Sequence, residues 1–593
     1  MSEPSRKQIV SVAAAIFFFA LVLRLIGIGW GLKNDLHNQS YHPDEPVVFA
    51  YSQAIEPTKL QFTPGFYNYG TLYLTMLRIT GDMTAAYTGG PEKSDDSYWS
   101  FVSRVHLAGR VLSALAGAAT ALMLFFIGLR LFGLFGGIAS GLLIAVSSGH
   151  VVHSRFQTVD IIATFFLAVS ALYALKLLDD YGEAKQYTKA VVLAGVFAGL
   201  SAGTKYTGIL ALLTVFVAVE ALRRKRNWTT AEAQKLDGAA VASSLLVFLL
   251  TTPGVMLDTE KFMRDFKYEM THTATGHGLV FAGSAPGFIY HLGNLFSGIG
   301  ILLTAFGIAG LVWAAVRRNW WAIALLAFFV PYYVLIGRAE VKFLRYTFPL
   351  YVGIAAGFGY AISESQKNER WKKTAIVFGI FAIGGVDTGG LMGSAKATGW
   401  MAAEDPRDSA ARSFEKGMPV TVGYAKDPWT WSVPLFKDST LPRMPMGPSY
   451  LTHVNGLLQS GAPQGWETLF RARMALMAFA EHPTPRLYYT PSQYTAVGDG
   501  EFHYKDFDER LITDLKPDYI TLTSLEVGPL ERLRNTKVEA EDVRNAVEQY
   551  SKFHDALEKD YAPVATFGAV APSVEDMQYV QPEVLVWKRK TPG

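Results

Sequence analysis

Long apolar runs separated by short polar connections fill the chain up to about residue 395. Most of these runs approach the roughly 20 residues that a helix needs to cross the hydrocarbon core of a bilayer. The pattern therefore predicts a polytopic α-helical membrane module over residues 1–395. We expect eleven spans, at 9–30, 107–129, 134–149, 161–177, 188–204, 206–222, 238–256, 295–316, 320–337, 343–362 and 374–394.

After residue 395 the pattern becomes that of a soluble domain. A mixture of strands and helices indicates a small α/β domain over residues 396–593. Its sequence has no nucleophile elbow, P-loop or metal motif, so we expect a lid or acceptor-guiding domain rather than a second enzyme. The predicted strands are 418–425, 486–491, 517–524 and 582–589, and 540–560 has the pattern of an amphipathic helix.

The basic residues indicate how the module lies in the membrane. The first apolar run follows Arg6 and Lys7 and is too long for a signal-peptide core, so we expect an anchor whose N-terminus is cytoplasmic. Cytoplasmic connections carry an excess of Lys and Arg. This topology places the first loop (31–106) and residues 396–593 outside, at a bacterial-type cytoplasmic membrane. It places inside the residues Arg130, Lys176, Lys185, Lys189, 223–226, Arg317, Arg318, Lys367, Arg370, Lys372 and Lys373.

Composition supports the membrane assignment and excludes several other classes. Only 18% of the 593 residues are charged, whereas about 25% is usual in soluble chains. The net charge is +3 and no basic tract resembles a nucleic-acid arm, so no nucleic-acid partner is expected. Contact with membrane lipids is expected from the apolar runs. The chain has no cysteine, so disulfides, thiolate catalysis and cysteine metal sites are excluded.

Ionisable and aromatic residues gather on the connections predicted to lie outside. The first loop contains "HPDE" at 42–45, and its apolar stretch 62–80 fits a helix lying along the interface. Shorter connections carry "SSGHVVHSRFQTVD" (147–160), "GTKYTG" (203–208) and "GRAEVKFLRYTFPLY" (337–351). The candidate residues are Asp44, Glu45, His150, His153, Arg155, Asp160, Lys205, Tyr206, Arg338, Lys342 and Arg345.

Each candidate has an ordinary explanation when it is taken alone. Lys and Arg at helix ends extend towards the interface, Asp160 suits a helix N-cap, and acids after Pro43 suit a helix start. Together, however, they place costly charges at one membrane depth, which indicates function. Cations bind phosphate and an acid accepts a proton. The set predicts group transfer from a phosphate-bearing lipid at the outer surface.

The motifs resemble those of a known family. "HPDE", "GFYNYGTLYL", "HSRFQTVD", "GTKYTG" and "FLRYTFPLY" occur in the order seen in membrane-embedded GT-C glycosyltransferases, and "DPRDSAARSF" (405–414) resembles the entry to their outer domain. The likeness covers residues 9–395 and is to the protein O-mannosyltransferase and aminoarabinose-transferase group. One departure is 68–71, "NYGT", where bacterial relatives often have a proline pair.

The resemblance implies a GT-C fold and inverting transfer of a sugar from a polyprenyl-phosphate donor to a lipid, glycan or protein acceptor. It implies that Asp44 is the general base, that Glu45 tunes it and that Asp160 is a second acid. No cofactor is expected to be required, although a divalent metal held by Asp44 and Asp160 stays open. Donor-phosphate contacts are expected from Arg155, Lys205, Tyr206, Arg338, Lys342 and Arg345, and further substrate contacts from His42, Tyr69, His150 and His153.

Two other classes of protein were weighed against an enzyme. A transporter or flippase for a lipid-linked sugar predicts charges on inner segments and repeated halves, and the sequence shows neither. A scaffold or receptor does not require so many polar groups at membrane depth. The enzyme is favoured, with the sugar open among mannose, aminoarabinose, arabinose and galacturonic acid. The acceptor stays open among protein Ser/Thr, lipid A, a glycan and another lipid.

Overall fold

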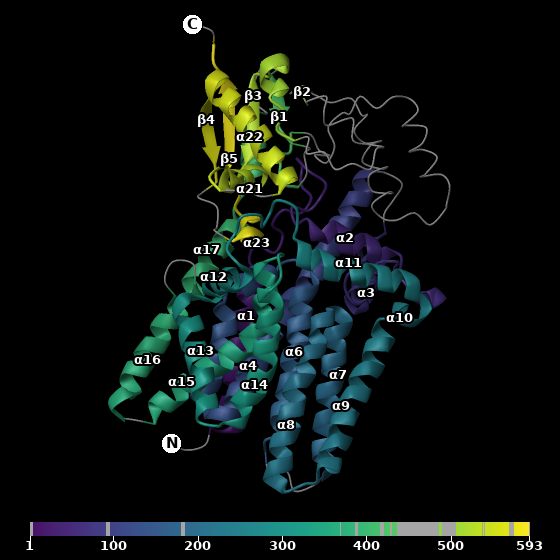
Figure 1. The fold of residues 1–593 in the computed structure, drawn as a ribbon, viewed down its shortest axis with the longest axis vertical. Helices are drawn as coiled ribbons and strands as arrows, with labels where there is room; N and C mark the ends of the chain where they lie inside the picture. Colours follow the sequence, from purple (N-terminus) through teal and green to yellow (C-terminus); the bar gives the residue numbers. More distant parts are fainter. Residues whose placement is uncertain are drawn as a thin grey trace.

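A helical module and a sheet domain stacked on one of its ends make up the fold (Figure 1). The N-terminus lies at the opposite end of the module from the sheet domain. We call the end that adjoins the sheet domain the domain end. This computed structural model describes residues 4–90, 95–179, 184–367, 369–385, 389–414, 420–426, 430–435, 486–488, 506–536, 538, 540–568 and 574–591.

The helical module confirms the expected polytopic architecture. Among the described residues, 7 helices are long and apolar enough to cross a membrane, or up to 8 if one bent pair counts as a span. The helices of the module are α1 (Arg6–Leu25), α4 (Asp95–Val146), α6 (Val159–Lys176), α7 (Ala184–Thr204), α8 (Ala211–Arg226), α9 (Thr230–Thr251), α12 (Gly287–Ile299), α13 (Ile301–Val316), α14 (Trp320–Gly337), α15 (Tyr351–Gln366), α16 (Glu369–Gly384) and α17 (Gly390–Ala402).

Several expected spans differ in shape from a straight helix. The expected spans 107–129 and 134–149 are joined in α4, which has a non-helical break at Gly133. The segment expected at 295–316 is bent by 113° between α12 and α13, where Gly300 has a φ of 114°. Positive φ is accessible to glycine, and it ends a regular helix. The last expected span divides between α16 and α17, and the number of spans stays a prediction.

Glycines allow close approach between helices inside the module. A Cβ added to Gly357 of α15 would lie 2.0 Å from the carbonyl oxygen of Gly307 of α13. The two backbones therefore meet directly. Helices in lipid gain little from a hydrophobic driving force, so such small residues allow the backbone contact that holds them together.

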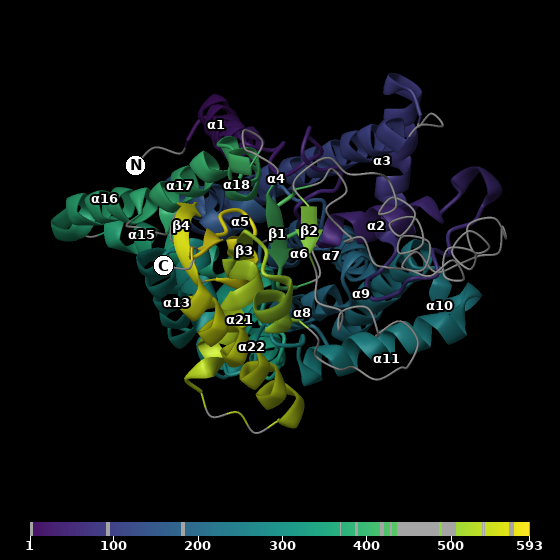
Figure 2. The same ribbon diagram turned by 90° about the horizontal axis from the view of Figure 1, so that it is seen from above.

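Short elements form a layer at the domain end, to one side of the sheet domain (Figure 2). The helix expected at 62–80 is displaced along the chain, because residues 62–71 are not helical and α3 runs from Leu72 to Thr88. Pro64 and two glycines within that stretch disfavour a helix. The elements of this layer are α2 (Asp44–Gln53), η1 (Pro57–Lys59), α3 (Leu72–Thr88), α10 (Gly254–Leu257) and α11 (Thr259–Thr275).

The C-terminal domain has the expected mixed α/β composition. Its sheet has the strand order β2-β1-β3-β5-β4, with β1 parallel to β2 and β3, and β5 antiparallel to β3 and β4. The helix α17 continues past residue 395, so the domain begins with α18. Its elements are α18 (Pro406–Phe414), β1 (Thr421–Tyr424), β2 (Arg486–Tyr488), η5 (Leu511–Leu515), β3 (Tyr519–Thr523), α21 (Ser524–Arg534), α22 (Glu541–Asp560), β4 (Tyr561–Phe567), α23 (Glu575–Gln578) and β5 (Val584–Arg589).

The predicted strands are confirmed where the structure describes them. Residues 418, 419 and 489–491 of those predictions lie outside the described residues. The strand β4 was not predicted. It contains Pro563 and forms the edge of the sheet, which is where a strand tolerates a residue without an N–H.

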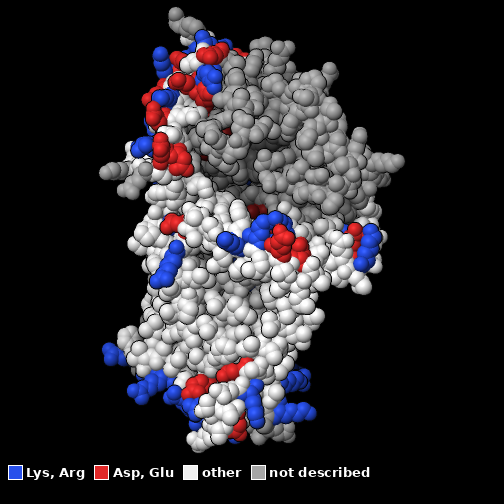
Figure 3. All heavy atoms as spheres, turned by 45° about the vertical axis from the view of Figure 1, so that its right-hand side comes forward, with Lys and Arg blue, Asp and Glu red and all other residues white. Residues whose placement is uncertain are grey.

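Charge is distributed unevenly along the molecule. On the face that Figure 3 shows, the helical module has a band almost free of charge, with Lys and Arg gathered at the end opposite the sheet domain. The basic C-terminus of α8, Arg223–Arg226, belongs to that end. The band matches the surface that a bilayer covers.

A buried arginine ties the sheet domain to the first loop. Arg407 donates two hydrogen bonds of 2.8 Å to the carboxylate of Asp405 and one of 2.8 Å to the carbonyl of Tyr579. Its guanidinium lies 3.7 Å from the centroid of the Tyr41 ring, which belongs to the first loop. One side chain therefore contacts the start of the domain, its C-terminal segment and the loop.

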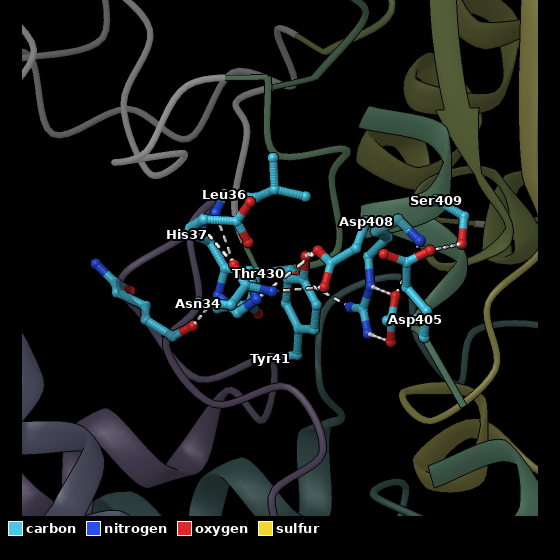
Figure 4. A network of polar contacts seen from close by, with 12 residues as sticks. Asn34, Leu36, His37, Tyr41, Asp405, Asp408, Ser409 and Thr430 are labelled. Atoms are coloured by element: carbon cyan, nitrogen blue, oxygen red, sulfur yellow. Dashed lines mark hydrogen bonds and ion pairs between the residues drawn. The ribbon is translucent and has the colours of Figure 1, made fainter. Parts of the chain in front are cut away.

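Figure 4 shows the neighbouring contacts between the same segments. The Tyr41 hydroxyl donates to Asp408, and the Asn34 amide donates to Asp408 over 2.7 Å. The backbone N–H groups of Leu36 and His37 donate to the Asn34 side-chain oxygen. The first loop is thus folded around an acid of the sheet domain.

We predict that Arg407→Met lowers thermal stability in detergent. Breaking a buried ion pair costs about 3–5 kcal/mol, because the remaining carboxylate is left buried and unpaired. The control is Arg412→Met, which removes an arginine that pairs with Asp35 and Glu404 at the surface and is expected to leave the transition nearly unchanged. The measurement is the unfolding temperature. Equal unfolding temperatures for the two variants would show that Arg407 does not tie the sheet domain to the first loop.

Candidate functional site

Asp44 begins α2 at the domain end. The preceding Pro43 has the fixed φ that suits a helix start, and a carboxylate in the first turn is favourable there. The Asp44 N–H donates to Nδ1 of His42 over 3.2 Å. Its Oδ2 lies 3.3 Å from Nη2 of Arg345, and 33% of its side chain is exposed. Asp44 is therefore held beside a cation while it stays accessible.

Asp160 and Lys205 form a second ion pair next to the first. Asp160 is the second residue of α6, and Lys205 precedes η2 (Tyr206–Leu210). The Lys205 Nζ lies 2.6 Å from Oδ1 of Asp160 and 4.1 Å from the centroid of the Tyr346 ring. The Asp160 Oδ2 is 3.8 Å from Nε of Arg345. Arg345, in η3 (Leu344–Leu350), thus links both predicted acids.

A small pocket opens beside these groups. It brings together three of the predicted residues, with apolar side chains and a tyrosine around them. Its volume is far below that of a typical ligand pocket, so it marks the point where the charges converge rather than a cavity that holds a whole substrate. Its lining includes Asp160, Lys205, Arg345, Leu167, Tyr332 and Pro349.

Asp576 also reaches this site, and the sequence did not indicate it. It lies in α23 of the sheet domain and is fully buried. Its Oδ2 is 3.7 Å from Nη1 of Arg345 and 3.4 Å from Nε2 of His153. The residue lies 231 positions from Arg345 in an ordinary acidic turn, so no local pattern marks it.

Glu45 has different partners from those of its neighbour Asp44. Its carboxylate accepts two hydrogen bonds of 2.8 Å from Arg110 and one of 2.8 Å from the N–H of Gln157. Burial alone would raise the pKa of Glu45, but the Arg110 guanidinium lowers it to about 2. A fully buried carboxylate with this many donors anchors the first loop to α4 and is not free to accept a substrate proton.

Tyr206 and Tyr69 meet on the other side of the site. The Tyr206 hydroxyl donates to the carbonyls of Tyr67 over 2.8 Å and Tyr69 over 2.9 Å. A Cβ on Gly70 would lie 2.0 Å from the carbonyl oxygen of Gly203. The close backbone approach explains a glycine here. The Tyr206 hydroxyl therefore holds the backbone around Tyr69 rather than the ion pairs.

Other predicted residues are placed among different partners. Arg155 donates to Thr398 over 2.5 Å, and Arg338 is exposed at the end of α14. The Lys342 Nζ lies 3.0 Å from Glu340, and His150 contacts Arg24 over 3.0 Å. Of the four predicted histidine and tyrosine contacts, His42 accepts from the Asp44 N–H and His153 lies beside Asp576. Burial raises the pKa of Tyr69, and the nearby Asp44 carboxylate adds to this rise.

The site's donor set does not fit a divalent metal. Among the residues that the structure describes, no group of three or more His, Cys, Asp and Glu is arranged to hold one. Asp44 and Asp160 are each paired with a cationic side chain. A metal ion would have to compete with these cationic side chains for the carboxylates.

His42 generates a prediction about pH. Burial lowers its pKa from 6.5 to about 4, although Asp44 and Glu45 oppose this. As the pH falls from about 6.5 to 4, the unfolded chain takes up a proton that the folded His42 does not, so stability falls. We expect His42→Gln to reduce this fall. The unfolding temperature in detergent, measured across that pH range, tests this. If it falls equally with pH in the variant and the wild type, His42 is not held in a neutral, buried state.

Glu45→Gln is predicted to destabilise the protein. The amide cannot accept both guanidinium bonds, and Arg110 is left as a buried charge without its partner, which costs about 3–5 kcal/mol. The measurement is the unfolding temperature of the purified variant beside Asp44→Asn, whose carboxylate is partly exposed. If Glu45→Gln proves as stable as the wild type, Glu45 does not anchor the loop.

Comparisons with known proteins agree with this architecture. The model of the family described as dolichyl-phosphate-mannose-protein mannosyltransferase matches residues 101–251. No curated protein matches the chain. The archaeal oligosaccharyltransferase AglB from Archaeoglobus fulgidus, in complex with an inhibitory peptide and a dolichol-phosphate, is 12% identical, with 98% of this chain and 88% of that chain covered and a TM-score of 0.50.

Structures of ArnT from Cupriavidus metallidurans also match. The apo form is 14% identical, with 97% of each chain covered and a TM-score of 0.46. The form bound to undecaprenyl phosphate is 16% identical, with 66% of this chain and 68% of that chain covered and a TM-score of 0.44.

The AglB likeness spans both parts of the chain and confirms the expected fold. The family-model match falls on the stretch from α4 to α9, which contains Asp160 and Lys205. The chain therefore has the fold of AglB, and its residues 101–251 match the mannosyltransferase family model.

Proposed function

We propose that the protein transfers a sugar, with inversion, from a polyprenyl-phosphate donor to an acceptor hydroxyl. The observation that carries this proposal is the position of Arg345 between Asp44 and Asp160, with Lys205 beside Asp160. Segments far apart in the sequence thus supply an accessible acid next to two cations. General-base transfer away from a phosphate leaving group requires this combination.

Each group then has a distinct role. Asp44 accepts the proton of the acceptor hydroxyl, whose oxygen forms a bond to the anomeric carbon. The bond from that carbon to the phosphate oxygen breaks, and its electron pair leaves with the polyprenyl phosphate. Lys205 and Arg345 stabilise the charge that develops on this phosphate. Asp160 holds both cations in place.

We assign the positive charge to these two side chains rather than to a metal. Their ion pairs already occupy the carboxylates that a metal would bind. Arg155, Lys342 and His150 have no role in this proposal, because their described contacts lie elsewhere. Arg338 is exposed at the end of α14 and is not assigned a role either.

Two similar proteins support the donor class. The matching family model is described by dolichyl-phosphate-mannose, and AglB was solved with a dolichol-phosphate. Both name a polyprenyl phosphate. The family is named for mannose and AglB for an oligosaccharide, so the proposal for this chain names no sugar and ends at the lipid phosphate and an acceptor on a lipid, glycan or protein.

The charge distribution supports a proposal for the orientation. We propose that the basic end faces the cytoplasm and that the site and sheet domain lie outside a bacterial-type cytoplasmic membrane. The uncharged band and the basic C-terminus of α8 support this (Figure 3).

Cysteines introduced at the exposed Tyr87 and Arg224 are expected to react from opposite sides with a reagent that does not cross the membrane.

The first test is turnover of a panel of polyprenyl-phosphate sugars by the purified protein in liposomes. Released polyprenyl phosphate is counted, with and without a chelator and with each class of acceptor. A flippase moves the donor without releasing the lipid phosphate, so release separates the two functions. Activity that is unchanged by the chelator supports the assignment of charge to Lys205 and Arg345.

We predict that Asp44→Asn lowers turnover by at least about 100-fold, because the amide cannot accept the acceptor's proton. Asp35→Asn is the matched control, since Asp35 lies on the same loop and pairs with Arg412 at the surface. It is expected to keep wild-type turnover. If Asp44→Asn is as active as this control, Asp44 is not the base.

A further inference from the structure

We propose that Asp576 of the sheet domain is a positioning residue for Arg345, so that the C-terminal domain completes the catalytic centre. This inference rests on the function proposed above. It concerns a part of the chain that lies outside the sequence motifs and outside the family-model match at 101–251.

The Asp576 carboxylate holds both the backbone and the side chain of Arg345. Its Oδ1 accepts from the N–H of Leu344 over 3.0 Å, and its Oδ2 accepts from the N–H of Arg345 over 3.1 Å. These N–H groups begin η3, where helical donors have no partner within the helix. The same Oδ2 lies 3.7 Å from Nη1. Asp576 therefore sets where η3 starts and where its arginine points.

Exposure separates the roles of the three acids around Arg345. Its nitrogens Nη2, Nε and Nη1 lie next to Asp44, Asp160 and Asp576 respectively. The exposed fractions of these acid side chains are 33%, 6% and 0%. A substrate can reach Asp44 but not Asp576. The buried acids hold the guanidinium, and the exposed acid is left for chemistry.

The segment that carries Asp576 is built into the helical module. Val574, Met577 and Val580 belong to the same buried apolar cluster as Leu344 and Phe348. Opening this segment like a lid would expose a buried carboxylate and these apolar side chains. The segment therefore acts as a fixed wall of the site.

The same segment also supports the environment of Asp44. The Tyr579 ring centroid lies 5.6 Å from that of His42, and the His42 Nδ1 accepts from the Asp44 N–H. The Tyr579 carbonyl is in turn held by Arg407. One turn of the sheet domain thus contacts the supports of both the proposed base and the proposed phosphate-binding arginine.

The test uses the full-length protein with Asp576→Asn. The amide keeps one acceptor but turns a donor towards the second N–H, and it removes the charge beside Nη1. The matched control is Glu575→Gln, because Glu575 pairs with Arg532 over 3.1 Å and not with Arg345. The readouts are binding of undecaprenyl phosphate without a sugar, and kcat/KM for the donor that the wild type uses.

We expect Asp576→Asn to weaken undecaprenyl phosphate binding and to lower kcat/KM by about 10–100-fold, since a misplaced catalytic group loses up to about 100-fold. In an Arg345→Ala background it is expected to cause no further loss, because Asp576 acts through Arg345. A merely structural role would lower the activity of that background as well. The Glu575→Gln control is expected to match the wild type.

Three outcomes would overturn the inference. Wild-type binding and turnover by Asp576→Asn would exclude positioning, and tighter binding would show that the carboxylate competes with phosphate. An additive loss with Arg345→Ala would show an effect that does not pass through Arg345. If Asp576→Asn does not fold, Asp576→Glu replaces it, with the same expected loss from a carboxylate displaced by one methylene. A wild type that binds neither undecaprenyl phosphate nor dolichyl phosphate overturns the proposed function itself.

Discussion

The guanidinium of Arg345 is the group on which the site depends. Only 9% of its side chain is exposed, and a buried charge costs several kcal/mol unless opposite charges and hydrogen bonds compensate it. Here the compensation comes from Asp44, Asp160 and Asp576, on α2, α6 and α23. Because these three acids compensate the charge of one arginine, the first loop, a membrane helix and the sheet domain meet at that side chain.

The same constraint explains why the two adjacent acids of the first loop differ. Successive helix residues are about 100° apart around the axis, so Asp44 and Glu45 point in different directions from the start of α2. Glu45 meets the buried Arg110 and is saturated with donors. Asp44 meets Arg345 at the edge of the site. One motif thus provides an anchor and a reactive acid.

The sequence predicts the helices and site residues that show as a pattern within one continuous stretch of the chain. Apolar runs mark the helices because the bilayer sets their length and composition, and short motifs marked Asp44, Asp160, Lys205 and Arg345. The bend at Gly300 was missed because a glycine that packs helices and one that turns the chain look alike. Asp576 was missed because an ion pair across 231 residues leaves no periodicity around either partner.

The charges of the site connect proton transfer to phosphate departure in the proposed mechanism. Three carboxylates surround Arg345 and Lys205, so the fully ionised group has one negative charge in excess. A proton that arrives on Asp44 removes that excess and weakens the hold of Asp44 on Arg345. The leaving phosphate gains charge in the same step. Arg345 is then freed on the side that a substrate reaches, while Asp576 and Asp160 keep it in place to stabilise the phosphate.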